Sequence, residues 1–201
     1  MRKIGIMGGS FDPCHRGHIN LAIDAKLQAE LDQVILMPAK IQPFKQDKKV
    51  TEEFHRVNML QCAVEGIEGL RVSTWEIEQD SISYTYKTLE AVKEMEGPDT
   101  EIYFVSGTDS FLSLERWMKG PQMLETNNFI VGVRPGYKED ELNQQIDYVR
   151  EKYGTNVIKI DNRRFHISST EIRDRIAAGQ SFSDLVVEEV EKYILENGLY
   201  I

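Results

Sequence analysis

The chain has 201 residues, a formal net charge of −9 and an isoelectric point near 5.0. This acidic balance argues against a nucleic-acid-binding protein, because that function needs a broad basic surface. A small anionic ligand remains compatible, provided that the fold builds a local positive pocket for it. The sequence has no run of about 18 apolar residues, so we expect no membrane contact.

The N-terminus and the cysteine content predict a cytoplasmic protein. The first residues lead directly into a short strand pattern and glycines, without the apolar segment and cleavage site of a signal peptide. Cys14 and Cys62 make no disulfide framework, so we expect both thiols to be reduced.

Short apolar runs alternate with longer helical patterns along the chain. The apolar runs predict strands at 4–7, 34–37, 70–75, 102–105, 129–133 and 157–160. Helical spacing and capping residues predict helices at about 19–27, 51–66, 85–96, 111–118, 139–153, 169–178 and 184–196. Thr51 is the expected N-cap of the second of these helices.

This order of elements predicts an α/β fold with a Rossmann-like, doubly wound parallel sheet and C-terminal helices. We expect a single domain over residues 1–201, with its C-terminal helical part beginning near residue 167. Ligands of such sheets bind beyond the carboxyl ends of the strands, so the residues that follow each strand are the functional candidates.

The loop after the first strand, residues 8–18, reads GGSFDPCHRGH. Gly8 and Gly9 allow backbone amides to approach a ligand closely. His15 and His18 stand at the start of the next helix, where free N–H groups favour phosphate, and Gly17 between them leaves room for a ligand. The loop therefore predicts a phosphate-binding site.

There are four alternative interpretations of the same loop. It could be a glycine-rich turn with two surface histidines, or a zinc site, although no Cys or carboxylate set completes such a site. A Cys14–His15 nucleophilic pair is disfavoured, because adjacent loop residues rarely face each other. A dinucleotide-binding dehydrogenase is disfavoured because the glycines do not read G-x-G-x-x-G and the second strand ends without an acidic residue.

Two separate motifs carry a family resemblance. GGSFDPCHRGH resembles the (H/T)-x-G-H signature of the nucleotidyltransferase superfamily, and ISSTEIR at residues 167–173 resembles its second, Ser-Ser-Thr-x-x-Arg-like motif. Within that superfamily the chain is similar from end to end to bacterial nicotinate-nucleotide adenylyltransferases. The further matching stretches are MPAKIQPFK at 37–45, HRVNML at 55–60, SYT at 83–85, GTD at 107–109 and RPG at 134–136.

The resemblance implies adenylyl transfer from ATP to nicotinate mononucleotide, giving deamido-NAD and pyrophosphate in NAD biosynthesis. It implies that His15, His18 and Arg173 are catalytic. The implied ATP-binding residues are Gly8, Gly9, Ser10, Phe11, His15, His18, Gly107, Asp109, Ser168, Ser169, Thr170 and Arg173. The implied nicotinate-nucleotide-binding residues are Lys45, Tyr84, Thr85, Trp117 and Arg134. Mg²⁺ is expected with ATP, without a dedicated metal site on the chain.

Several of these residues could also have purely structural roles. Ser168 can cap a helix in a capping box with Glu171, Asp109 can be an N-cap, and Trp117 can be a core residue of an amphipathic helix.

The chain departs from the family pattern Pro-Pro-His-Lys at Gln42-Pro43-Phe44-Lys45.

Two other functions and the oligomeric state also stay open. The alternatives are a sister adenylyltransferase of the pantetheine-phosphate type and a non-catalytic nucleotide-binding module on the same fold. The expected partners are ATP and nicotinate mononucleotide, with no nucleic acid. A homo-oligomer is compatible with the sequence.

Overall fold

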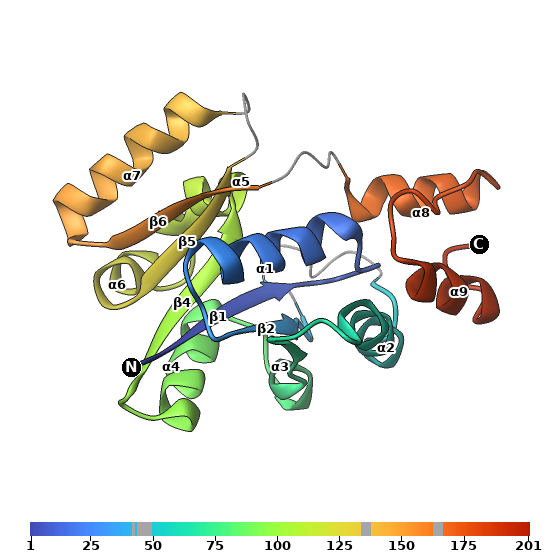
Figure 1. The fold of residues 1–201 in the computed structure, drawn as a ribbon, viewed down its shortest axis with the longest axis horizontal. Coiled ribbons are helices and arrows are strands. Elements are labelled where there is room, and N and C mark those ends of the chain that lie inside the picture. The colour runs from blue at the N-terminus through green and yellow to red at the C-terminus, as the bar shows by residue number, and fades with distance from the viewer. Residues whose placement is uncertain (42, 44–49, 134–137, 163–166) are drawn as a thin grey trace.

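The computed structural model describes residues 1–41, 43, 50–133, 138–162 and 167–201 (Figure 1). Its centre is a parallel six-stranded sheet in the order β3-β2-β1-β4-β5-β6. The strands are β1 (Arg2–Gly9), β2 (Gln33–Pro38), β3 (Leu70–Val72), β4 (Thr100–Gly107), β5 (Asn128–Val133) and β6 (Asn156–Asp161). The chain runs outward from β1 to β3 and then returns to β4 on the other side of β1. The predicted doubly wound sheet is therefore confirmed.

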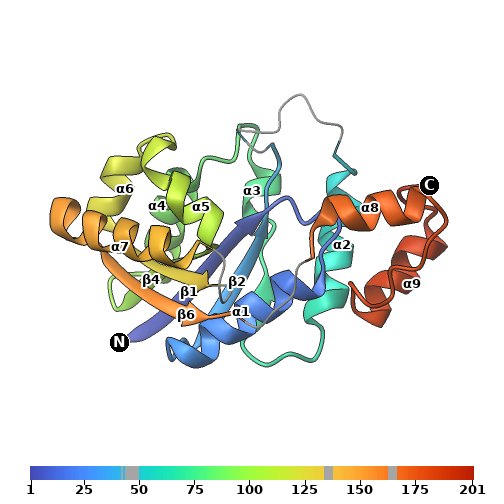
Figure 2. The ribbon, with the colours of Figure 1, turned by 90° about the horizontal axis from the view of Figure 1, so that it is seen from above.

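Helices cover both faces of this sheet (Figures 1 and 2). They are α1 (Arg16–Gln28), α2 (Glu53–Val64), α3 (Trp75–Glu78), α4 (Thr85–Glu96), α5 (Thr108–Ser113), the 3-10 helix η1 (Leu114–Arg116), α6 (Gly120–Thr126), α7 (Glu139–Tyr153), α8 (Ser169–Ala177) and α9 (Glu188–Glu196). One apolar cluster joins the sheet to α1, α2, α8 and α9, and a second joins it to α4, α5, α6 and α7. Helices α8 and α9 lie beside α2, beyond the carboxyl end of β1.

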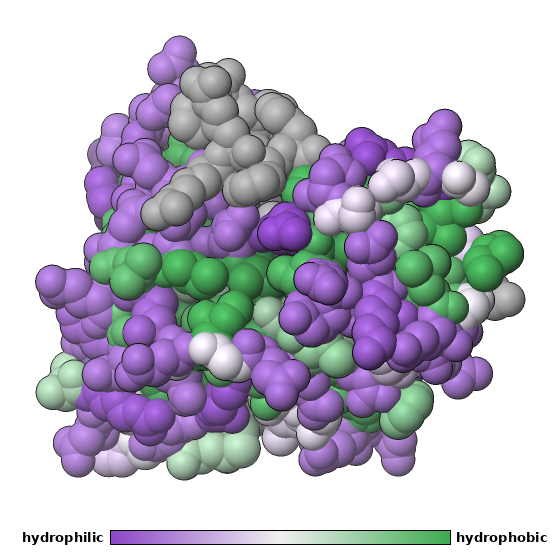
Figure 3. Space-filling view, turned by 45° about the vertical axis from the view of Figure 1, so that its right-hand side comes forward, coloured by the Kyte–Doolittle hydropathy of each residue, from purple (hydrophilic) through white to green (hydrophobic). Residues whose placement is uncertain are grey.

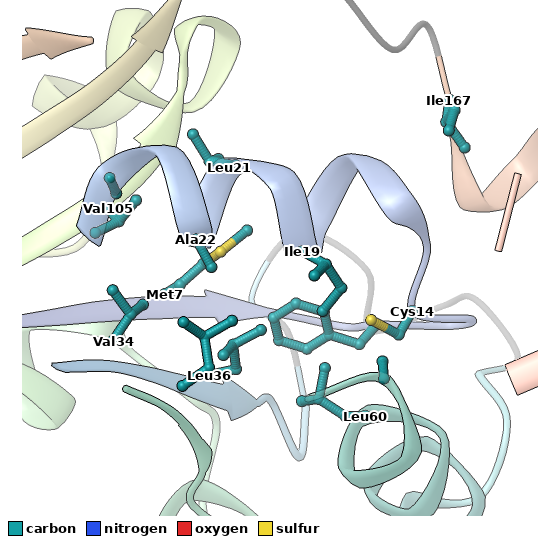
Figure 4. Packing of buried hydrophobic residues seen from close by; sticks show 14 of the residues in the cluster. Met7, Cys14, Ile19, Leu21, Ala22, Val34, Leu36, Leu60, Val105 and Ile167 are labelled. Carbon is teal, nitrogen blue, oxygen red and sulfur yellow. The ribbon is translucent and has the colours of Figure 1, made fainter. Parts of the chain in front are cut away.

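Strand β1 shows why these runs form a doubly covered sheet. Ile4 and Ile6 pack into the second cluster, whereas Met7 packs into the first, as expected for alternating side chains buried on both faces. Figure 4 shows Met7 beside Ala22 of α1. Hydrophilic residues cover much of the face seen in Figure 3, in keeping with the acidic composition. No helix among the described residues is long and apolar enough to cross a bilayer.

One predicted strand ends earlier in the structure, and one predicted helix is interrupted. The third strand ends at Val72, and Trp75 begins α3 and packs on the second cluster instead of continuing the strand. The helix predicted at 111–118 is interrupted after η1, because Trp117 is extended and Lys119 is left-handed, with φ of 57°. A side chain at Gly120 would lie 2.3 Å from the carbonyl oxygen of Leu114, so only glycine permits the close approach that follows.

The predicted starts of α2 and α9 are also corrected, and α5 begins at Thr108 rather than 111. The residue before the first turn of α2 is Glu52 rather than Thr51, and its side chain makes no capping hydrogen bond. The carbonyl of Thr51 accepts a hydrogen bond from Arg56 instead. The last helix begins at Glu188 rather than near 184.

Candidate active site

His15 and His18 form a reciprocal pair at the N-terminus of α1. The backbone N–H of His18 donates to Nδ1 of His15, and the backbone N–H of His15 donates to Nδ1 of His18, both over 3.3 Å. The two rings are stacked, with centroids 3.6 Å apart. His15 is the N-cap of α1, so imidazoles here perform the capping that Ser or Asp usually provides.

This arrangement determines which ring nitrogen faces a ligand. Since Nδ1 of each ring accepts a backbone N–H, a neutral imidazole must carry its proton on Nε2. Both rings therefore present an N–H donor on the side away from the helix backbone. His18 is the more exposed of the two, whereas only 7% of His15 is accessible. Two donors at a helix N-terminus suit phosphate oxygens.

The residues around the histidines hold the pair in place. The sequence predicts that Gly17 leaves room for a ligand. In the structure, a Cβ at Gly17 would lie 3.1 Å from ring atoms of His15, so the glycine makes room for the histidine stack instead. Phe11 is fully buried, and its ring meets His18 edge to face at 4.9 Å. Gly8 and Gly9 are the last residues of β1, paired with β2, rather than part of the loop. Gly8 is exposed, as a backbone approach to ligand requires.

Helix α8 brings the second motif onto the same loop. The hydroxyl of Ser169 donates to the carbonyl of Pro13 over 3.0 Å. Arg173 donates to the carbonyl of Asp12 over 2.6 Å and to the Thr170 hydroxyl over 3.3 Å. The sheet order and these contacts thus join two motifs that lie far apart in the sequence.

The start of α8 is capped differently from the expected capping box. Ser168 does cap the helix, because its hydroxyl accepts the N–H of Glu171 over 3.1 Å. The Glu171 carboxylate instead forms an ion pair with Arg175 over 2.7 Å, as an i,i+4 pair on the helix surface. The preceding N–H groups of α8, those of Ser169 and Thr170, have no acceptor within the helix and are suited to anionic oxygens.

Gly107 and Asp109 lie at the carboxyl end of β4, the strand next to β1. A Cβ at Gly107 would meet nothing within 4 Å, so there is open space above this strand end. Gly107, not Asp109, is the N-cap of α5. Asp109 is in the first turn and forms an ion pair with Lys138 over 3.1 Å. Its carboxylate is 58% exposed and accessible to a ligand.

Trp117 borders the same end of the sheet. Its Nε1 donates to the Ser113 hydroxyl over 3.0 Å, and its ring meets that of Phe104 at 6.1 Å. A Cβ at Gly8 would lie 4.0 Å from the ring of Phe104. The Phe104 ring therefore connects Trp117 with the end of β1. The indole packs against the second apolar cluster yet stays half-buried. This position is compatible with stacking on a ligand.

Comparisons with known proteins agree with this geometry. A family model described as cytidylyltransferase-like matches residues 6–175. A probable nicotinate-nucleotide adenylyltransferase of Clostridium botulinum (strain Eklund 17B / Type B) is 40% identical over 100% of this chain and 98% of its own length. Its counterpart in Carboxydothermus hydrogenoformans is 38% identical over 98% of both chains. The chain belongs to the nicotinate-nucleotide adenylyltransferase family.

Solved structures share the fold. The nicotinic acid mononucleotide adenylyltransferase of Plasmodium falciparum complexed with NaAD has a TM-score of 0.80 at 24% identity, covering 100% of this chain and 98% of its own. A putative nicotinate-nucleotide adenylyltransferase from Vibrio parahaemolyticus has a TM-score of 0.67 at 21% identity, covering 100% of this chain and 96% of its own. These likenesses confirm the Rossmann-like architecture of this adenylyltransferase-family chain.

The remaining residues that the family resemblance indicated for the acceptor lie on two kinds of segment. Tyr84 precedes α4 and Thr85 is its first residue, so both stand at a helix N-terminus. The Tyr84 ring stacks on that of Tyr86 at 6.0 Å. Lys45 and Arg134 fall outside the described residues, as does the Phe44 that departs from the family pattern.

Sequence reasoning missed Arg56, the largest fully buried side chain, which is 1% exposed. Its Nη1 donates to the carbonyls of Ser10 and Ala39, both over 2.8 Å, and its Nε donates to that of Thr51 over 2.9 Å. Burial lowers the pKa of the guanidinium, and the charge of Asp12 opposes that shift. Arg56 therefore clamps the segments that follow β1 and β2. The sequence could have indicated this role, because Arg56 is a charged residue at helical spacing with the buried residues Met59, Leu60 and Ala63 of α2.

Two alternative roles of the first loop were a Cys14–His15 nucleophilic pair and a zinc site. Cys14 is fully buried, and burial raises the pKa of its thiol, so it is a core residue without thiolate character. Over the described ranges, no group of three His, Cys, Asp or Glu side chains could hold a metal ion. His55 has a structural contact instead, with the Tyr193 hydroxyl over 3.0 Å between α2 and α9.

Glu76 is a buried carboxylate behind the Tyr84–Thr85 segment. It is 6% exposed, and its Oε1 accepts the Thr88 hydroxyl over 2.5 Å. It borders a cavity of about 310 Å³ between α3 and α4. Burial raises the pKa of Glu76, and hydrogen bonds from the Thr88 and Ser83 hydroxyls oppose the shift. Ser83 in turn accepts the N–H of Lys40 over 3.0 Å, which links α4 to the end of β2.

This environment predicts a pH dependence of stability. Because the folded state favours the protonated Glu76, its contribution is fully present below the unfolded pKa and is lost as pH rises through the folded pKa. In urea unfolding between about pH 4 and pH 8, wild type should therefore lose stability relative to Glu76→Gln as pH rises. Glu78→Gln, on the exposed side of the same helix, is the control. A constant difference between wild type and Glu76→Gln would contradict the expectation.

Proposed function

We propose that this protein transfers the adenylyl group of ATP to nicotinate mononucleotide, with release of pyrophosphate and formation of deamido-NAD. The observation that carries the proposal is the joining of the His15–His18 pair and Arg173 on one loop, at the carboxyl end of β1. Full-length similarity to nicotinate-nucleotide adenylyltransferases supports the choice of acceptor.

The reaction is an in-line displacement at the α-phosphorus of ATP. A phosphate oxygen of the acceptor forms the new bond, and the bond from the α-phosphorus to the bridging oxygen of the β-phosphate breaks. The bonding electrons leave with pyrophosphate. Such a displacement needs positioning and charge neutralisation rather than a protein nucleophile. The buried, protonated Cys14 is consistent with that requirement.

Each part of the site then has a chemical role. The Nε2–H groups of His18 and His15 donate to the phosphates, with His18 stabilising the charge that develops in transfer. Arg173 and the first N–H groups of α8 hold the leaving pyrophosphate. Asp109, beyond β4, accepts hydrogen bonds from the ribose hydroxyls.

The acceptor occupies the space between α4 and Trp117. Donors at Tyr84 and Thr85 meet the nicotinate carboxylate, and the Trp117 indole stacks on the ring. Lys45 and Arg134 contribute positive charge to the mononucleotide phosphate. We assign the reaction to the cytoplasm, where Cys14 and Cys62 stay reduced; neither is in a disulfide.

We infer that Mg²⁺ enters with ATP rather than through a site of the chain. The described residues around the histidines offer imidazole, guanidinium and amide donors, which suit phosphate oxygens, and the Asp12 carboxylate already accepts two hydrogen bonds. When bound, the ion would neutralise charge on the phosphates.

Acceptor choice tests the function. We expect kcat/KM for nicotinate mononucleotide to exceed that for its amide by at least about tenfold, measured as pyrophosphate release at saturating Mg-ATP. The reason is that the Thr85 N–H, at the start of α4, and the hydroxyls of Thr85 and Tyr84 satisfy a carboxylate. An amide NH₂ facing the same donors leaves buried groups unpaired, at about 1–3 kcal/mol each.

Two other outcomes would contradict the proposal. A ratio within about threefold would mean that the carboxylate is not recognised. Preference for 4′-phosphopantetheine would identify the sister activity, and ATP binding without pyrophosphate release from any acceptor would indicate a nucleotide-binding module.

A further inference from the structure

The chain's penultimate residue reaches the phosphate-binding loop. The Tyr200 hydroxyl donates to Oδ1 of Asp12 over 2.8 Å, a contact between residues separated by 188 positions. Asp12 lies between β1 and the His15–His18 pair and is 6% exposed. The last turn of the chain is therefore in direct contact with the centre of the first motif.

Asp12 receives contacts from three distant segments. Besides the Tyr200 hydroxyl on Oδ1, the N–H of Thr51 donates to Oδ2 over 3.4 Å, and Arg173 donates to its backbone carbonyl over 2.6 Å. A shift of this residue displaces the acceptor of the Arg173 guanidinium. It also moves His15, three positions along the same loop.

The backbone of Tyr200 is adapted to this contact. Its φ is 68°, a left-handed value that is unfavourable for a residue with a bulky side chain. The side chain is half-buried, and its hydroxyl also lies 3.9 Å from the sulfur of Met59 on α2. Burial raises the pKa of the Tyr200 phenol, so the hydroxyl stays protonated and donates to Asp12.

We propose that Tyr200 is a positioning residue that holds Asp12, and through it Arg173 and His15, in the geometry that binds the triphosphate of ATP. This inference rests on the proposed function for its effect on turnover. The effect on nucleotide binding follows from the contacts alone. The described acceptor candidates lie at the start of α4 and after η1, and the described hydrogen bonds of Asp12 go to Thr51, Arg173 and Tyr200 instead. Acceptor binding should therefore change little.

The C-terminal segment has a second tyrosine that makes a matched control. The Tyr193 hydroxyl, on α9, contacts Nδ1 of His55 and accepts a hydrogen bond from Asn58, both over 3.0 Å. Both tyrosines attach the C-terminal segment to α2, but the described contacts of Tyr193 do not include the loop of Asp12. Loss of either hydroxyl leaves the ring packing in place.

The test compares Tyr200→Phe with Tyr193→Phe in the full chain. Titration calorimetry with α,β-methylene ATP gives nucleotide affinity, steady-state pyrophosphate release gives kcat and both KM values, and thermal melts give stability. We expect Tyr200→Phe to weaken analogue binding and to lower kcat/KM for ATP by about tenfold, because misplaced positioning groups lose binding geometry. Its KM for the acceptor should stay within about twofold of wild type.

Tyr193→Phe should lower the melting temperature about as much as Tyr200→Phe does, and it should leave nucleotide affinity unchanged. Equal losses of affinity in both variants, or wild-type affinity in Tyr200→Phe, would overturn the positioning role. A wild-type protein that binds the analogue but releases no pyrophosphate would contradict the proposed function only, since the calorimetric comparison still decides the role of Tyr200.

Discussion

His18→Ala should lower kcat by about 10²–10³-fold while changing the affinity for an ATP analogue only a few-fold. The substitution removes an Nε2–H donor whose orientation is set by the bond from the His15 backbone to Nδ1, over 3.3 Å. A donor placed where charge develops contributes mainly to the transition state, so the loss should appear in kcat. Pyrophosphate release under saturating substrates measures it.

A control must separate this effect from the loss of a capping contact at α1. Removing a cap costs about 1 kcal/mol of stability, which a thermal melt detects. His55→Ala removes a histidine that contacts Tyr193 between α2 and α9, away from the loop of His15 and His18. We expect that variant to lose stability and keep its turnover. Turnover of His18→Ala close to that of wild type would refute the assigned role.

Arg56→Met should lower the free energy of unfolding by about 3–5 kcal/mol, the usual cost of breaking a buried charged contact. Methionine fills part of the volume but leaves the carbonyls of Ser10, Ala39 and Thr51 buried without their donor. The charge of Asp12 also loses its nearby cation. At about 2–4 °C per kcal/mol for a chain of this size, the melting temperature should fall by roughly 10 °C.

Arg150→Met provides the comparison for this prediction. Arg150 also donates to a backbone carbonyl, that of Val157 over 2.8 Å, but its side chain is 51% exposed. Water can replace that donor, so we expect a loss below about 1 kcal/mol. Urea unfolding of both variants measures the difference. A similar small loss at Arg56 would mean that the clamp does not stabilise the two strand ends.

The elements and the position of the glycine–histidine motif could be predicted from the sequence because their signals are local. The apolar runs of the strands and the polar pattern of α7, Glu139–Tyr153, have lengths and periods that identify them without knowledge of the fold. The glycines and histidines of residues 8–18 specify a helix start and a set of donors within a few residues of each other. Strand–helix alternation then determines the parallel sheet, since crossovers of one hand allow few arrangements.

Local sequence patterns could not predict the contacts that the fold creates between residues far apart in the sequence. The break between η1 and α6 depends on the close approach at Gly120, and the end of β3 depends on where Trp75 packs. The roles of Arg56 and Tyr200 depend on acceptors far away in sequence, on loops whose positions follow from strand order.

The sequence by itself therefore determined the fold class, the placement of the first motif after β1 and the family of the chain. Only the tertiary structure decided how that motif is held. Arg173 docks on the carbonyl of Asp12, and the Tyr200 hydroxyl donates to the Asp12 carboxylate from 188 positions away. The physical reason is that a hydrogen bond between distant segments leaves no periodic trace in either of them, and its geometry exists only after the layers have packed.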